Sequence, residues 1–359
     1  MANICICVHS LARGGGVQEL TGLLAQGLVS QGHRVTILCP VKPVKIVPSL
    51  PSSVEVIYLG DWADRVRYHL VFLPSKLRAY FKSNFFDAII SNTPQIIAIT
   101  AYALRASRNS SRLYGVVHGS LAYIGGIKQC VVSLICRYYL NFSKNRVEAY
   151  AAVSKGVARE IEKVVGGEVF VLYNPVINDL EVDRVSKKKS RSRKTIISVG
   201  RLHRQKGFDL LIKSLECLSD LDFNVKIVGD GPSRKSLEQK VVDCGLDGRV
   251  EFLGYRSDVL ELMEDSDLYV LSSRWEGFGN VLVEALYCQL PVVSFDCPHG
   301  PSEVLEAGRW GALVPVGDTE ALANEIRKGL VRGGRNVNKR WKDFCVSSVT
   351  KKYVSFLKV

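Results

Sequence analysis

The chain has 359 residues, of which 47% are hydrophobic and 23% charged, and its formal net charge is +13. This length suffices for two domains with separate hydrophobic cores, and the composition excludes a disordered or fibrous protein. Ten scattered cysteines without zinc-ribbon spacing indicate reduced, mostly buried thiols, and residues 1–3 lack the charged start of a signal peptide. We therefore expect a cytoplasmic protein.

The first half of the chain alternates short apolar strands with helices. Residues 3–9 and 34–39 predict strands on either side of a helix over 17–30. Such a βαβ unit opens a doubly wound α/β domain, with helices on both faces of a parallel sheet. Further strands are expected at 54–59, 87–91, 113–117, 148–153 and 168–172.

Two positions in this half are candidates for ligand contact. Gly15 and Gly16 precede a helix N-terminus, where a phosphate can approach the backbone, although a plain tight turn is the alternative. The glycines do not form G-x-G-x-x-G, and no acidic residue ends the second strand, which disfavours a nicotinamide dinucleotide. His118 follows the strand 113–117, at the sheet edge where α/β proteins bind ligands, so a site role is expected, although a structural role is the usual one for a lone histidine.

Basic residues accompany two apolar segments of the first half. Residues 1–180 carry 19 Lys and Arg against 10 Asp and Glu. Residues 62–82 predict an interfacial helix broken near Pro74, or alternatively a core helix with a solvated basic face, and 121–146 are a second candidate for lipid contact. Since no nucleic-acid-binding motif is present, we expect an anionic membrane surface as a partner and no nucleic acid. No stretch approaches the ~18 apolar residues of a membrane span.

A basic segment divides the chain. Val182 to Lys194 contains seven Lys and Arg and few apolar residues, which is typical of a solvated linker. We place a first domain at 1–176, the linker at 177–194 and a second α/β domain at 195–344. The tail, 345–359, is predicted to pack back on the first domain.

Charged residues follow two predicted strands of the second domain. Arg201 and Lys206 come after the strand 195–199, and two cations there suit a diphosphate. Glu284 lies in an apolar helix over 281–288, where a carboxylate is costly unless it is hydrogen-bonded. It is either a salt-bridged structural residue or a ligand for a diol. Asp265 and Asp267 form a D-x-D pattern, which we interpret as a helix end, and no metal site is expected.

The motifs together resemble one family. Val199-Gly-Arg-Leu…Lys206-Gly, Gly229-Asp-Gly-Pro232 and Glu276-Gly-Phe-Gly…Glu284-Ala resemble, in this order and spacing, the retaining GT-B glycosyltransferases of family 4. The resemblance spans nearly the whole chain. It implies an α/β fold of two Rossmann-like domains facing across a cleft, the first binding the acceptor and the second the nucleotide-sugar donor.

The resemblance also implies roles for individual residues. Glu284 would hold the donor ribose, Glu276 would face the donor sugar, and Arg201 and Lys206 would neutralise the diphosphate; His118 would close on the donor. The implied catalytic residues are His118, Glu276, Arg201 and Lys206. The implied donor-binding residues are Gly15, Gly16, Arg201, Lys206, Gly229, Tyr255, Phe278, Gly279, Asn280 and Glu284.

The function implied by the resemblance is that of a retaining, metal-independent hexosyltransferase without a cofactor. It would move a hexose or N-acetylhexosamine from a UDP-sugar to a lipid-linked saccharide or lipopolysaccharide/O-antigen acceptor. The basic first domain places such an enzyme on the cytoplasmic face of the inner membrane, as a peripheral protein. A nucleotide-sugar epimerase or hydrolase without an acceptor is the alternative on the same fold.

Overall fold

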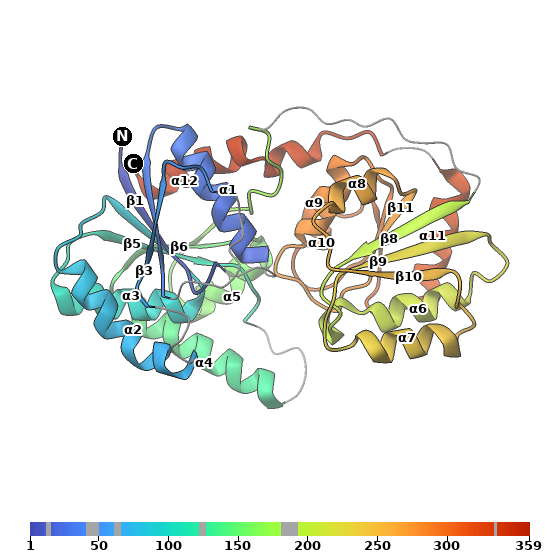
Figure 1. Cartoon of the computed structure of the whole chain (residues 1–359), viewed down its shortest axis with the longest axis horizontal. Coiled ribbons are helices and arrows are strands. Elements are labelled where there is room, and N and C mark those ends of the chain that lie inside the picture. Colours follow the sequence, from blue (N-terminus) through green and yellow to red (C-terminus); the bar gives the residue numbers. More distant parts are fainter. Residues whose placement is uncertain (12–15, 41–49, 61–65, 122–126, 181–192, 334–335) are drawn as a thin grey trace. The chain divides into compact units, whose positions relative to one another are not determined.

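The computed structural model describes residues 1–11, 16–40, 50–60, 66–121, 127–180, 193–333 and 336–359 (Figure 1). The chain forms two compact units. The first comprises Met1–Leu180 together with Phe344–Val359, and the second ends at Asp343. Residues 181–192 of the predicted linker lie outside the described residues, and so does Gly15.

The first unit is built on a parallel sheet in the order β3-β2-β1-β4-β5-β6-β7. The strand order reverses between β1 and β4, so the unit is doubly wound, as the βαβ pattern predicts. Residues of the inner strands are buried on both faces, which explains their continuous apolar runs in the sequence. The strands are β1 (Asn3–Cys7), β2 (Arg34–Cys39), β3 (Val54–Tyr58), β4 (Ala88–Asn92), β5 (Arg112–Val117), β6 (Val147–Ala152) and β7 (Val169–Val171).

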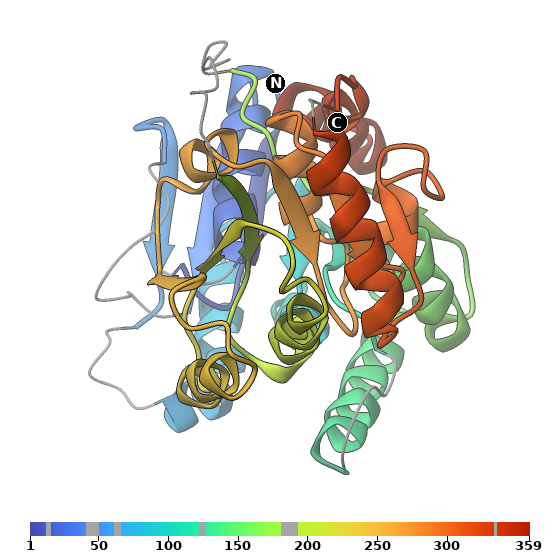
Figure 2. The same cartoon turned by 90° about the vertical axis from the view of Figure 1, so that its right-hand side faces the viewer.

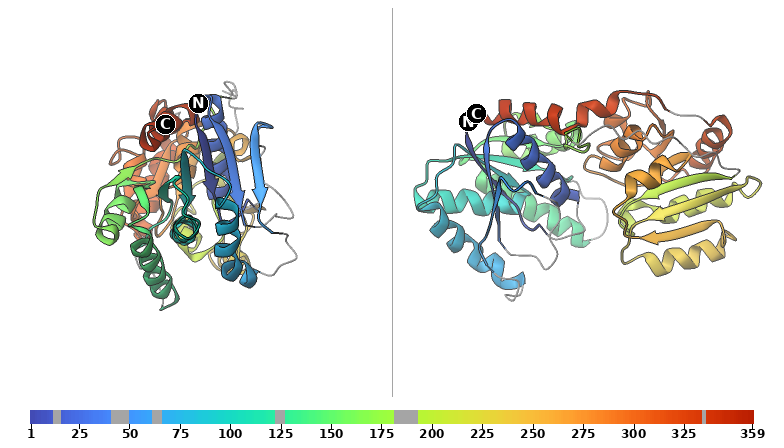
Figure 3. Two further views of the ribbon diagram at one scale, coloured as in Figure 1. Left: turned by 90° about the vertical axis from the view of Figure 1, so that its left-hand side faces the viewer. Right: turned by 45° about the horizontal axis from the view of Figure 1, so that its top comes forward.

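Helices cover both faces of this sheet (Figure 3). On one face, α1 (Gly16–Ser30) and α12 (Val346–Leu357) share a core with β1 and β2. On the other, α2 (Val66–Phe81) and α3 (Pro94–Ser107) pack against Cys5, Cys7 and Ile89. A third cluster joins α4 (Ile127–Ser143) and α5 (Lys155–Val165) to β6.

The C-terminal helix belongs to the first unit. Tyr353 and Leu357 of α12 are buried with α1, and the Tyr114 hydroxyl donates a hydrogen bond to the Leu357 carbonyl at 2.8 Å. The helices touch so closely that a Cβ at Gly27 would lie 2.1 Å from Thr350 Oγ1. Gly27 is therefore required for this approach.

Pro74 does not break its helix. The sequence predicts a break near this residue, but α2 runs through it from Val66 to Phe81. A proline removes one helical hydrogen bond, which favours a kink or break. Here Leu73, Leu77 and Phe81 are buried on one face of α2, and their packing against the sheet holds the helix together.

The second unit contains a parallel sheet in the order β10-β9-β8-β11-β12-β13. One face is covered by α6 (Phe208–Glu216), α7 (Arg234–Asp243) and α11 (Thr319–Arg332), which share the main core (Figure 2). α8 (Val259–Glu264), α9 (Asn280–Tyr287) and α10 (Pro301–Val304) lie on the other face. The strands are β8 (Lys194–Val199), β9 (Phe223–Val228), β10 (Val250–Gly254), β11 (Leu268–Leu271), β12 (Val292–Phe295) and β13 (Ala312–Val314), with short 3-10 helices at Arg204–Lys206 (η1) and Arg340–Phe344 (η2).

No helix in the described ranges is long and apolar enough to cross a membrane.

Candidate active site

The strand order of the second sheet reverses between β8 and β11. From β8 the order runs to β9 and β10 on one side, and from β11 to β12 and β13 on the other. Ligands of open α/β sheets bind outside the carboxyl ends of the strands at such a reversal. The loop after β8 carries Arg201 and Lys206, and the loop after β11 carries Glu276. The sequence-predicted residues thus lie on both sides of the expected ligand position.

Lys206 and Glu276 are paired with each other. Lys206 Nζ lies 2.6 Å from Glu276 Oε1, and the Ser273 hydroxyl donates to the same oxygen at 2.6 Å. The Glu276 side chain is only 7% exposed, so the ammonium and the hydroxyl compensate a carboxylate that is largely removed from water. Sequence reasoning assigned both residues to the ligand and missed this ion pair, because 70 residues separate them.

The loops on the two sides are clamped together. Arg274 donates two hydrogen bonds to the Asp209 carboxylate, at 2.8 and 2.6 Å, and its backbone N–H bonds to the Gln205 carbonyl at 2.7 Å. Burial acts to raise the pKa of Asp209, but the hydrogen bonds and charge of Arg274 outweigh it and lower that pKa. The Ser272 hydroxyl donates to the Lys206 carbonyl at 3.0 Å. These bonds fix the backbone on which Lys206 and Glu276 are mounted.

Glycines allow two close backbone contacts in the site. Gly207 has φ +63°, and a Cβ there would lie 1.9 Å from the Ser272 carbonyl oxygen. Gly229 has φ +132° and packs equally closely on the Gly200 carbonyl, so β8 and β9 end side by side. The Gly229 N–H donates to the Gly254 carbonyl at 2.8 Å, which places the exposed Tyr255 at the adjacent strand end.

The N-terminus of α9 follows the Glu276 loop. Gly279 has φ +89° and precedes Asn280, the first residue of the helix, while Phe278 is buried. First-turn N–H groups of a helix have no partner within the helix and attract anions. Glu284 lies one turn further on the same face as Asn280 and is half-buried. Its carboxylate is thus less enclosed than the apolar sequence around it suggests.

Tyr269 of β11 connects Glu276 and Glu284 electrostatically. Its side chain is fully buried. Burial and, next, the charges of Glu284 and Glu276 raise the pKa of Tyr269 well above its usual value. Burial and two carboxylates therefore oppose ionisation of this phenol, which stays neutral.

His118 belongs to the first unit, at the end of β5. Its Nδ1 lies 3.2 Å from Asn174 Oδ1, and its Nε2 is buried without a hydrogen-bond partner among the described residues. Burial lowers the pKa of His118 to about 4, and the Asn174 bond offsets this only in part. The imidazole is therefore neutral at physiological pH. Gly16, in the same unit, is the first residue of α1.

Asn174 was not singled out by sequence reasoning. It is buried, and the only signal was the Asn174-Pro175 step near the predicted domain boundary. With Nδ1–H donated to Asn174, the ring presents Nε2 as an acceptor. Among the predicted site residues of the second unit, Arg201 has an exposed side chain.

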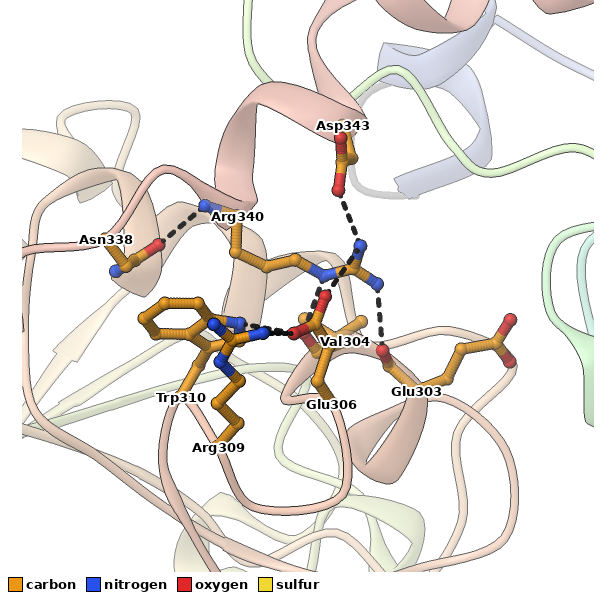
Figure 4. A network of polar contacts seen from close by, with 8 residues as sticks. All are labelled: Glu303, Val304, Glu306, Arg309, Trp310, Asn338, Arg340 and Asp343. Atoms are coloured by element: carbon orange, nitrogen blue, oxygen red, sulfur yellow. Dashed lines mark hydrogen bonds and ion pairs between the residues drawn. The ribbon is translucent and has the colours of Figure 1, made fainter.

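A polar network supports the loop between β12 and α10, which lies next to Glu276 (Figure 4). The Glu276 N–H bonds to the Pro298 carbonyl at 3.1 Å, so this loop borders the site. Arg340 donates to the carbonyls of Glu303 and Val304, at 3.0 and 3.2 Å, and pairs with Asp343 at 2.6 Å. The guanidinium thereby ties α10 to η2.

Within the described residues, no three His, Cys, Asp or Glu side chains gather as metal ligands would. Asp267 accepts a hydrogen bond from the Thr195 N–H at 2.9 Å and contacts Lys194, which accounts for it as a structural residue.

Comparisons with known proteins identify the family. Residues 14–180 match the model for Glycosyltransferase Family 4, and residues 179–343 match that for Glycosyl transferases group 1. An uncharacterized glycosyltransferase of Haemophilus influenzae is 26% identical over 92% of this chain and 90% of its own. The lipopolysaccharide core biosynthesis glycosyltransferase LpsE of Rhizobium meliloti is 33% identical over 41% of this chain and 42% of its own.

The fold recurs in solved structures. Anabaena Alr3699/HepE, in complex with UDP and glucose, superimposes with a TM-score of 0.76 at 21% identity, over 100% of both chains. The two doubly wound units therefore define a GT-B glycosyltransferase. The chain belongs to glycosyltransferase family 4.

Proposed function

We propose that this glycosyltransferase moves a hexose or N-acetylhexosamine from a UDP-sugar to a lipid-linked saccharide or lipopolysaccharide/O-antigen acceptor, with retention and without a metal ion. The observation that carries the proposal is the Lys206–Glu276 pair at the sheet reversal, beside the N-terminus of α9. The pair supplies a cation for a diphosphate and a carboxylate for sugar hydroxyls, and the N-terminus of α9 supplies N–H groups for the diphosphate. The LpsE and HepE relatives support a saccharide acceptor on a lipid and a UDP-linked donor.

Donor binding would redistribute the charges of the pair. A diphosphate near α9 competes with Glu276 for Lys206 Nζ, and exposed Arg201 is free to add a bidentate contact. Glu284, on the Asn280 face of α9, would accept hydrogen bonds from the ribose hydroxyls. In this arrangement Glu276 accepts a hydrogen bond from a sugar hydroxyl, while Lys206 contacts both Glu276 and the phosphate.

The same groups would stabilise the departing UDP. Preorganised cations and helix N–H groups oppose the negative charge that develops on the diphosphate as the glycosidic bond breaks. The anomeric carbon becomes oxocarbenium-like, and the acceptor attacks from the face that UDP leaves. A donor phosphate oxygen takes the acceptor proton. His118 of the first unit is neutral, and we include it as a further candidate contact of the donor sugar.

The test measures UDP release from a panel of UDP-sugars, with and without lipid-linked acceptors, and identifies products by mass. We expect acceptor-dependent release and loss of transfer in Glu284→Ala and in Lys206→Ala. Full activity in either variant contradicts the site assignment. Release that is equally fast without any acceptor favours the hydrolase or epimerase alternative.

A further inference from the structure

Helix α4 turns its large apolar side chains outward. Leu134 is 61% exposed and Tyr138 66% exposed. Val131, Ile135, Tyr138 and Phe142 follow the 4-3-4 spacing of a single helical stripe. The α4 face, as we call it, consists of the exposed residues Val131, Val132, Leu134, Ile135, Tyr138 and Phe142.

The inward side of α4 is held by smaller and more polar contacts. The Ser133 hydroxyl donates to the Leu121 carbonyl, and the Ser143 and Tyr150 hydroxyls are 2.8 Å apart. Leu140 is fully buried in the core with Val117. These bonds determine which side of the helix faces the unit, so the exposed apolar stripe is a consequence of specific packing and not of a missing core.

The surroundings of the α4 face are basic. Residues 88–147 contain seven Lys and Arg and no Asp or Glu. Arg137 and Lys144 are exposed on or beside α4, and Tyr102 and Arg105 are exposed on the adjacent α3. Aromatic and aliphatic side chains bordered by cations are typical of helices that lie in the headgroup region of anionic bilayers.

We propose that the α4 face docks on an anionic lipid bilayer. A second copy of the chain is a poorer occupant, because it carries the same excess of cations around α4 and residues 88–147 contain no carboxylate side chain to offset them. Anionic headgroups supply that missing negative charge. This surface deepens the proposed function, on which it rests, since a lipid-linked acceptor is presented at a bilayer.

The position of α4 agrees with such a role. β5 ends at Val117, directly before His118, and Ser133 links α4 to Leu121 of the following loop. Figures 1 and 3 show α4 at the outside of the first unit's helices. Docking through α4 would therefore anchor the unit that carries His118 at the bilayer.

The test is flotation of the full chain with phosphatidylcholine vesicles, with and without phosphatidylglycerol. We expect binding to the anionic vesicles and at least about a tenfold loss in Leu134→Glu/Tyr138→Glu. The matched control, Val242→Glu/Val331→Glu, places two carboxylates on exposed apolar positions of the second unit and should bind like the wild type. Arg137→Gln/Lys144→Gln should lose roughly tenfold toward anionic vesicles only.

Several outcomes overturn the proposal. These are no binding by the wild type, full binding by Leu134→Glu/Tyr138→Glu, equal binding to neutral and anionic vesicles, or a wild-type dimer that this variant converts to a monomer. Thermal unfolding of each variant shows that it is folded. Because flotation needs neither donor nor acceptor, its failure is distinct from an absence of acceptor-dependent UDP release, which concerns the proposed function.

Discussion

At the scale of single residues, the site is organised by partners that the sequence motifs do not reveal. Lys206 and Glu276 each have an expected ligand, yet they neutralise one another at 2.6 Å. His118 is expected to contact the donor, and buried Asn174 holds its Nδ1, which leaves Nε2 as the acceptor. In both cases a residue distant in the chain sets the charge balance or the tautomer of the group.

Breaking the Lys206–Glu276 pair should reduce stability unequally. Lys206→Met leaves an enclosed carboxylate with only Ser273, and we expect a loss of about 3 kcal/mol. Glu276→Gln leaves an ammonium that is 20% exposed and can reach water, so its loss should be smaller. The double variant should recover part of the loss in urea denaturation. Losses that simply add would show that the two residues are not coupled.

The pKa of His118 makes stability depend on pH. The folded-state pKa of about 4 lies below the unfolded value near 6.5, so the unfolded chain binds more protons between these limits. Stability is therefore present above about pH 6.5 and is lost as the pH falls toward 4, by about 3 kcal/mol at most. Urea denaturation at several pH values should reveal this loss, and it should shrink in His118→Asn.

Asn174→Asp tests the partner of His118 directly. A carboxylate beside Nδ1 stabilises the imidazolium, so the pKa of His118 should rise. Histidine signals in an NMR titration, assigned with His118→Asn, measure the change. An unaltered midpoint would mean that Asn174 does not contact the ring in solution.

At the scale of elements, the site depends on loops that only glycine permits to meet. Gly207→Ala would place a Cβ against the Ser272 carbonyl, whereas Gly245→Ala has nearly the same φ, +65° against +63°, and no atom within 4 Å. We expect Gly245→Ala to cost about 1 kcal/mol, from backbone strain alone, and Gly207→Ala clearly more. Thermal unfolding compares the two. Equal losses would show that the loop moves aside without cost.

The elements themselves were largely predictable. Both sheets follow from short apolar runs separated by helices, because strands buried on two faces lack polar residues. The helix α2 through Pro74 was not predictable, since its continuity depends on Leu73, Leu77 and Phe81 packing against a sheet. The Lys206–Glu276 ion pair was not predictable either, because spacing along the chain does not determine which loops meet.

At the scale of the whole molecule, the chain returns to its first unit at the C-terminus. Phe344–Val359 belongs to that unit, and Tyr353 is buried between α12 and the sheet core. The second unit, residues 181–343, is thus an insertion into the first unit, which the chain leaves after residue 180 and rejoins at residue 344. Ile177 and Cys345 form a β-bridge at that point.

Tyr353→Ala should therefore weaken one unit selectively. Removing a fully buried aromatic ring costs about 3–5 kcal/mol. In hydrogen exchange, amides of β1 and β2 should lose protection while those of β8 and β9 keep theirs. Lys351→Ala, at an exposed position of the same helix, is the control. Equal loss of protection in both sheets would mean that the units unfold together.

The sequence by itself determined the alternation of strands and helices, the two α/β units and the motifs that identify the family, because periodicity and glycine spacing are local properties of a chain. The tertiary structure alone decided that Lys206 meets Glu276, that Asn174 orients His118 and that α4 presents its apolar side to solvent. The first two depend on segments far apart in sequence being brought within a few ångströms by the packing of the sheets, and the third on which side of α4 packs against its own unit; no local pattern encodes these contacts.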